Sequence, residues 1–253
     1  MTYVELGVSN LGRSLELYSD LLGFPLRMST VDSAGRPMAV LGSGPAVLHL
    51  VEVGPGGRPS VWDANDLQCG IRHFGMKVAD VDAWAGRLKA AGLSFALDPF
   101  DAFGGVRIAF FFDPDGAYLE LVQGYVRHNN LWSAELAQQE VDGDRGWDGA
   151  PRFDHVAVTV PDLNEALELY TGRLGLGGVG QLVRPGEERG FLITNLRAGA
   201  ATLEVFTFDQ PTFRRTGGAE PDRLGLRAIG VRGVDGTELG PGDVPLRGAS
   251  VLD

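Results

Sequence analysis

The stretch that decides the fold is HVAVTVPDLNEALELYTGRLGL, residues 155–176. Its first six residues alternate, so that the valines would lie on one face of a strand and His155 on the other. Asp162 then stands where a helix N-cap is expected. The apolar residues that follow are spaced by four, three and four: Leu163, Leu167, Tyr170 and Leu174. This pattern predicts a strand that leads into an amphipathic helix.

The same pattern occurs at two other places in the chain. Residues 3–22 read YVELGVSN and then LGRSLELYSDLL, and residues 73–91 read HFGMKVAD and then VDAWAGRLKAA. Strand-like runs follow each helix. A fourth copy begins at RAIGVRGVD (227–235), but a Gly- and Pro-rich stretch replaces its helix and the sequence ends at Asp253. Such repeats predict an α+β fold of tandem βαβββ modules, with the last module truncated.

The length and the composition suggest a two-domain protein. A chain of 253 residues favours two domains of ordinary size. Residues 125–151 are polar and mixed, as expected of a linker. We therefore expect one domain of two modules over residues 1–124, a linker over residues 125–151, and a second domain over residues 152–253.

Charge and hydropathy argue against two classes of partner. The formal net charge is −11, and nucleic-acid affinity rests mainly on basic side chains. No apolar run approaches the ~20 residues that a membrane span needs. The single cysteine, Cys69, excludes a disulfide within the chain and a Cys-based zinc site. With no signal-peptide pattern at the N-terminus, we expect a cytoplasmic protein without nucleic-acid or membrane partners.

Histidine and glutamate stand at equivalent positions of the modules. His73 and His155 open the first strands of the second and third modules, and Glu120 and Glu204 lie in their last strands. Alternation puts each of them opposite the helix-packing face. Two imidazoles and two carboxylates suit one divalent ion of Fe, Mn, Zn, Ni or Co. The absence of thiolates points to an open, catalytic metal site.

Two assemblies of the modules would give different sites. If the second and third modules pair, the ligands are His73, Glu120, His155 and Glu204. If the first and second pair, they are His49, His73 and Glu120, with Tyr3 where a histidine would be expected. We favour the first assembly because all four of its residues are ordinary ligands. Tyr3 is then a packed aromatic residue or a supporting hydrogen-bonding group.

The chain resembles the vicinal oxygen chelate superfamily, which contains glyoxalases, epimerases, extradiol dioxygenases and drug-resistance proteins. The resemblance rests on HFGMKVADVDAW, HVAVTVPDLNEALELY, LGVSNLGRSLELYSDLLGF and FDPDGAYLELV. It implies that the first-strand His and last-strand Glu residues bind the metal, namely His73, Glu120, His155 and Glu204. It also implies isomerase or lyase chemistry on a small substrate with vicinal oxygens, with Glu120 or Glu204 as the base, and a possible homodimer.

Two other functions fit the same resemblance. An Fe²⁺ or Mn²⁺ extradiol dioxygenase would use a two-His, one-carboxylate site that leaves room for substrate and oxygen. A metal-free protein that binds a drug would use the aromatic residues of the same fold. The truncated fourth module argues against a second metal site.

Overall fold

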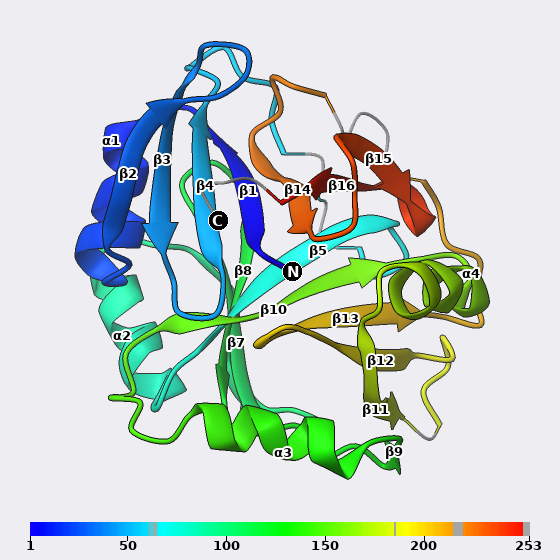
Figure 1. The fold of residues 1–253 in the computed structure, drawn as a ribbon. Coiled ribbons are helices and arrows are strands. Elements are labelled where there is room, and N and C mark those ends of the chain that lie inside the picture. Colours follow the sequence, from blue (N-terminus) through cyan, green and yellow to red (C-terminus); the bar gives the residue numbers. More distant parts are fainter. Residues whose placement is uncertain (61, 63–64, 185, 215–219, 250–253) are drawn as a thin grey trace.

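The computed structural model describes residues 1–253 except 61, 63–64, 185, 215–219 and 250–253. Four modules follow one another along the chain (Figure 1). The elements of the first module are β1 (Tyr3–Val8), α1 (Leu11–Leu15), η1 (Glu16–Leu21), β2 (Leu26–Val31), β3 (Pro37–Gly42) and β4 (Val47–Glu52). Those of the second are β5 (Gly70–Lys77), α2 (Val81–Ala90), β6 (Phe95–Asp101), β7 (Arg107–Phe112) and β8 (Tyr118–Gln123).

The second half of the chain repeats this plan and then shortens it. A connecting segment contains β9 (Asn130–Leu131) and α3 (Ala134–Gly143). The third module consists of β10 (Arg152–Thr159), α4 (Leu163–Leu167), η2 (Glu168–Arg173), β11 (Gly177–Val183), β12 (Leu192–Ala198) and β13 (Ala201–Thr207). The fourth has no long helix and consists of β14 (Gly225–Val231), β15 (Thr237–Gly240), η3 (Pro241–Asp243) and β16 (Val244–Gly248).

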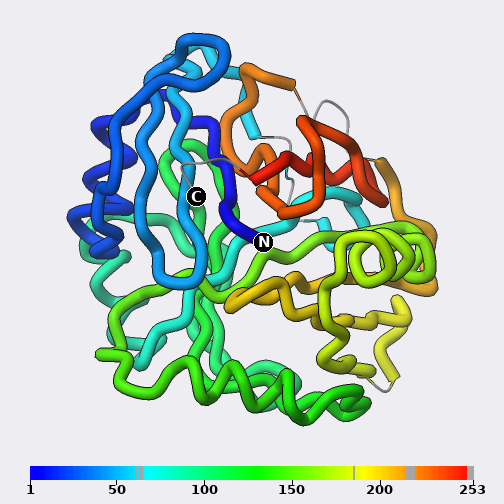
Figure 2. The backbone as a smooth tube through the Cα atoms, in the orientation of Figure 1, coloured from blue at the N-terminus to red at the C-terminus, as the bar shows by residue number. Residues whose placement is uncertain are grey.

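The modules pair as the second with the third and the first with the fourth. In the nine-stranded sheet, with the order β6-β7-β8-β5-β10-β13-β12-β11-β9, β5 runs antiparallel to β10. In the seven-stranded sheet, with the order β15-β16-β14-β1-β4-β3-β2, β1 runs antiparallel to β14. Figure 2 shows both junctions, cyan beside green and blue beside orange. The sheets therefore contain the favoured pairing, that of the second module with the third.

The expected domain ranges, 1–124 and 152–253, stay a prediction. Each sheet takes strands from both sides of residues 125–151. One core joins the two sheets. The valines of β10 that face the helix are buried in it, together with Phe74 of β5 and Leu6 of β1. This burial removes one face of every first strand from solvent and leaves the opposite face for His73 and His155.

The α+β architecture of repeated modules is confirmed, and three details differ from expectation. The helices at 11–22 and 163–174 change to π-helical turns at Glu16 and Glu168, with Leu22 N–H donating to the Leu17 carbonyl. Six residues of an apolar pattern cannot distinguish such turns from α-helical ones. The strands directly after the first two helices, β2 and β6, are mostly exposed, whereas a half-buried strand would alternate between buried and exposed residues. Finally, the expected linker contains α3. No helix in the described part of the chain is long and apolar enough to cross a membrane.

Candidate metal centre

Four strands of the nine-stranded sheet bring His73, Glu120, His155 and Glu204 together. His73 lies on β5, Glu120 on β8, His155 on β10 and Glu204 on β13. The strands are neighbours in the order β8-β5-β10-β13. All four residues are less than a tenth exposed. The junction between the second and third modules therefore gathers one His and one Glu from each module.

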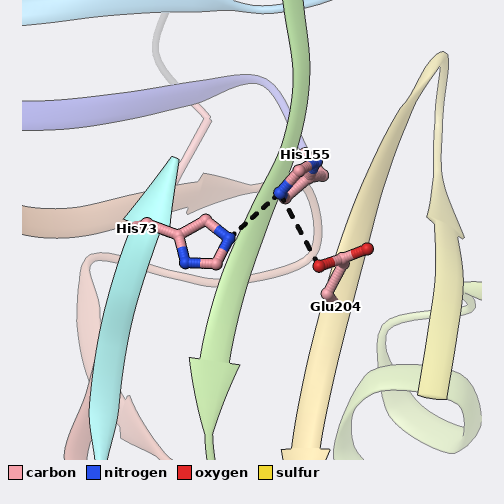
Figure 3. A group of neighbouring side chains, drawn as sticks. All are labelled: His73, His155 and Glu204. Carbon is pink, nitrogen blue, oxygen red and sulfur yellow. Dashed lines mark hydrogen bonds and ion pairs between the residues drawn. The ribbon is translucent and has the colours of Figure 1, made fainter. Parts of the chain in front are cut away.

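The donor atoms of these residues converge on one point. The two imidazole Nε2 atoms are 3.1 Å apart. Glu120 Oε2 lies 2.9 Å from Nε2 of both His73 and His155. Glu204 Oε2 lies 3.6 Å from His155 Nε2. Figure 3 shows the two rings and Glu204 pointing toward one another from three strands, and those three offer ligand atoms within 4.8 Å of one another.

This geometry fits a divalent metal ion. Ligands about 2.1 Å from a metal are separated by about 3.0 Å when they are adjacent in octahedral geometry. The distances from 2.9 to 3.6 Å between these donors match that spacing. With neutral imidazoles, the two carboxylates carry two negative charges, which a divalent cation would balance. His73, Glu120, His155 and Glu204 could therefore hold one ion and leave positions for a substrate.

Two residues around the donors fix the ring of His155. Asp154 Oδ2 lies 2.9 Å from His155 Nδ1, which selects the tautomer that leaves Nε2 for a ligand interaction. Gly75 pairs with His155 across β5 and β10, and a Cβ atom at residue 75 would overlap the imidazole ring. Glycine is thus the residue that lets the ring lie flat over the neighbouring strand.

Burial and charge separate the pKa values of the four groups. Burial lowers the pKa of His73 to about 4, against the effect of Glu120. Burial would also lower the pKa of His155, but Glu204, Asp154 and Glu120 raise it well above its ordinary value. Burial would raise the pKa of Glu120, but hydrogen bonds with His155 and His73 lower it to about 2. Burial raises the pKa of Glu204 to about 7.

A cavity of about 500 Å³ opens onto the four donors. Beyond them its wall combines aliphatic side chains with aromatic ones, such as Phe110, Tyr118 and Phe206, and with charged ones, such as Arg72 and Arg189. The Phe110 ring stacks on Tyr118 at 5.0 Å and meets the edge of His73 at 5.2 Å. The guanidinium of Arg72 lies 4.2 Å over Phe206 and is paired with Asp66 at 2.6 Å. The centre thus lies at the end of a small apolar chamber, suited to a small organic molecule.

The other residues of the sequence prediction lie elsewhere. Tyr3 on β1 and His49 on β4 belong to the seven-stranded sheet, where their rings stack at 4.1 Å. Both are 4% exposed. The structure does not bring them to His73 and Glu120. The alternative set that combined His49 with His73 is therefore divided between the two sheets.

Comparisons with known proteins agree with this architecture. Residues 1–121 match the family model described as "Glyoxalase/Bleomycin resistance protein/Dioxygenase superfamily". A probable lactoylglutathione lyase of Vibrio cholerae is 31% identical over 134 residues, which are 50% of this chain and 91% of that protein. The chain belongs to this superfamily. The recognition made from the sequence motifs is confirmed.

Two further relatives in the superfamily are longer proteins. A lactoylglutathione lyase of Arabidopsis thaliana is 28% identical over 181 residues, which cover 70% of this chain but only 55% of that protein. The chain thus spans about half the length of that relative. A crystal structure of a glyoxalase I variant from Zea mays matches with a TM-score of 0.69 at 18% identity, covering 98% of this chain and 91% of that one. At this identity the likeness concerns the fold.

Sequence reasoning missed the residues that support the donors. Asp154 directly precedes His155, and an acid beside a candidate ligand is a signal that could have been used. Gly75 follows His73 by two residues, and Gly230 stands at the same place in the fourth module. Their role depends on a ring from the partner strand, which the sequence alone does not pair with them.

Proposed function

We propose that the protein is a divalent-metal-dependent enzyme of the lyase or isomerase type. Its substrate would be a small organic molecule with two adjacent oxygens. The observation that carries the proposal is the convergence of His73, Glu120, His155 and Glu204 at the end of an apolar cavity. All four donors belong to one chain, so the proposed site needs no second copy. A homodimer and a cytoplasmic location stay predictions.

A bound metal would act as a Lewis acid on the two substrate oxygens. The two carboxylates would have different roles. Glu120 Oε2 contacts both imidazoles and is held in place. Glu204 has looser contacts, 3.6 Å to His155 and 3.4 Å to the Asn195 amide. Glu204 is therefore the better base: its carboxylate would take a proton from a carbon that bears one oxygen and return it to the neighbouring carbon.

The side chains of the cavity would orient the substrate and keep water away. Phe110, Tyr118 and Phe206 form the wall next to the donors, so that the proton would move in a poorly hydrated space. The reaction leaves the oxidation state of the molecule unchanged, because one carbon loses the proton that the other gains. The names of the relatives, lactoylglutathione lyases, make lactoylglutathione the first substrate to test.

In the experiment, the metal-free protein is loaded separately with Zn²⁺, Ni²⁺, Co²⁺, Mn²⁺ or Fe²⁺. The formation and the breakdown of lactoylglutathione are then measured for each form. We expect turnover with at least one metal, loss of turnover on chelation, and loss in Glu204→Gln with the metal still bound. Turnover that is unaffected by chelation would overturn the proposal. A metal content below about 0.1 per chain after reconstitution would instead favour the metal-free binding function.

One observation favours a ring-cleaving dioxygenase as a second candidate. His73, His155 and Glu204 together form a two-His, one-carboxylate group, the set that Fe²⁺ oxygenases use. Fe²⁺-loaded protein should then turn catechols yellow under air. A lack of colour across several catechols, with Fe²⁺ shown to be bound, would exclude this function for those substrates.

A further inference from the structure

Lys77 is a buried lysine at the end of the strand that carries His73. Its residue is 2% exposed, which is rare for a lysine unless it is paired. It follows His73 by four positions on β5, so strand alternation puts both side chains on the same face of the sheet. The site therefore shares its sheet face with a buried cation that the proposed reaction does not use.

The ammonium group of Lys77 meets the segment that contains α3. It contacts Glu140 of α3 and lies 3.9 Å from Asp144 Oδ2 at the C-terminal end of that helix. It also lies 4.2 Å over the ring of Tyr125, whose hydroxyl donates to Asp144 at 2.8 Å. No residue of the helix is fully buried, so these polar contacts tie it to the sheet together with the packing of Leu136 against Gly177 of β11.

The same ammonium group reaches the metal centre through one carboxylate. Lys77 Nζ lies 3.4 Å from Asp154 Oδ1, and the other oxygen of that carboxylate lies 2.9 Å from His155 Nδ1. The side chain of Asp154 is 14% exposed. Lys77 and His155 thus hold the two oxygens of one largely buried carboxylate, one from each side.

Charge explains why this arrangement depends on Lys77. Glu140, Asp144 and Asp154 all lie within 4.0 Å of its nitrogen, and Arg152 pairs with Asp144. Without the ammonium group, three carboxylates would face one another, with the guanidinium of Arg152 paired to Asp144 and that of Arg197 acting on Glu140. Loss of one partner from a buried ion pair is strongly unfavourable, so the carboxylates would turn apart. This movement would release Asp154 from its fixed position.

We propose that Lys77 is a positioning residue for the metal centre. Acting through Asp154, it fixes the orientation and the tautomer of His155 and connects that ring to α3. Residues 125–151, which the sequence predicts to be a simple linker, would therefore support the site. This inference rests on the proposed metal function.

The test measures Co²⁺ binding to metal-free wild-type protein and to Lys77→Met, by calorimetry and by the visible spectrum of bound Co²⁺. Outer-shell residues typically change metal affinity by 10–100-fold, and we expect a loss of about tenfold in Lys77→Met with an altered Co²⁺ spectrum. Asp154→Asn should show the same or a larger loss. The double variant should bind no more weakly than Asp154→Asn, because Lys77 acts only through that carboxylate.

A matched control separates positioning from general support of α3. Arg197 is also buried and donates to the Leu136 carbonyl of α3 at 3.3 Å. Arg197→Met should lower the Tm and leave the Co²⁺ affinity and spectrum unchanged. If Lys77→Met does not fold, Lys77→Gln carries the same expectation, because its polar amide is easier to accommodate among carboxylates but is shorter than the lysine side chain and carries no charge.

Wild-type Co²⁺ affinity in either folded Lys77 variant would overturn the inference, and so would losses that add in the double variant. A wild-type protein that binds neither Co²⁺ nor any other divalent ion would overturn the proposed function itself. If Arg197→Met weakens Co²⁺ binding as much as Lys77→Met does, then α3, and not Lys77, supports the site, and the inference fails.

Discussion

The two sheets build the same module junction from different residues. In the nine-stranded sheet, Ala157 pairs with Glu204 and with His73 across the neighbouring strands. In the seven-stranded sheet, Glu5 of β1 pairs with His49 and with Ala228 in the same registers. Glu120 lies opposite Gly75, and Arg247 lies opposite Gly230. The equivalent sets are thus His73, Glu120, His155 and Glu204 in one sheet and Ala228, Arg247, Tyr3 and His49 in the other.

The second set occupies the equivalent backbone positions, but it contains a cationic side chain and no carboxylate. Arg247 brings a positive charge to the place of Glu120, and its guanidinium pairs with Glu5. Arg227 Nε lies 3.4 Å from the other oxygen of Glu5. A cation at a ligand position repels a metal ion, and the Glu5 carboxylate offsets part of the charge of the two arginines. The module junction therefore supplies the same backbone geometry in both sheets, and the side chains decide whether it forms an ion site or an internal ion pair.

The largest expected difference between the two junctions concerns Glu120 and Arg247. Glu120→Ala removes an oxygen 2.9 Å from both imidazoles, and we expect metal affinity to fall about 100-fold or more. Arg247→Ala changes the equivalent position and should leave metal affinity unchanged. Calorimetric Co²⁺ titration of both variants measures the contrast. Equal losses in both would show that the two junctions are coupled rather than distinct.

The two glycines that lie under the rings give a matched pair. A Cβ at residue 75 would overlap His155, and one at residue 230 would overlap Tyr3. Gly75→Ala and Gly230→Ala should each lower the free energy of unfolding by about 1–3 kcal/mol, because both crowd a buried ring. Gly75→Ala should in addition weaken metal binding. Denaturation of the metal-free proteins and a Co²⁺ titration distinguish these effects, and metal loss in Gly230→Ala would contradict the comparison.

Glu5 tests the structural role of the second junction. Glu5→Ala leaves Arg227, which is 2% exposed, without its carboxylate partner. Removal of one partner of a buried ion pair costs about 3 kcal/mol, and we expect that loss in the free energy of unfolding. Urea denaturation measures it. Metal affinity should not change; unchanged stability together with weakened metal binding would reverse the roles assigned to the two junctions.

The smallest effect concerns the support of Glu204. The amide of Asn195 lies 3.4 Å from Glu204 Oε1, a long hydrogen bond. Loss of a weak hydrogen bond changes an equilibrium by roughly threefold, so Asn195→Ala should weaken metal binding by about that factor. A competition assay against a metal indicator resolves a change of this size. A loss as large as that of Glu120→Ala would mean that Glu204 depends on Asn195 for its position.

The sequence predicted the fold and much of the candidate site because both depend on local periodicity. Alternation placed His73 and His155 opposite the apolar residues that pack on the helices, and similar spacing joined them to Glu120 and Glu204. Whether the second module pairs with the third or with the first is a long-range choice between similar strands. Local sequence therefore left His49 open as an alternative, and the strand registers separate it from His73.

The support of the site could not be predicted for a related reason. Lys77 and Glu140 are ordinary charged residues in a strand and a polar helix, and only the folded chain brings them together. The polar composition of α3, whose residues are all at least partly exposed, is also that of a solvated linker. Contacts that depend on charge pairing across distant segments leave no periodic pattern in the sequence.

The most direct test of the account is the metal stoichiometry of four proteins: the wild type, His155→Ala, His73→Ala and His49→Ala. Each is stripped, reconstituted with Co²⁺ or Zn²⁺, and analysed for metal per chain after removal of the excess. We expect one ion per chain in the wild type and in His49→Ala, and nearly none in the other two. Full metal content in His155→Ala, or its loss in His49→Ala, would contradict the central claim that the junction of the second and third modules holds the ion.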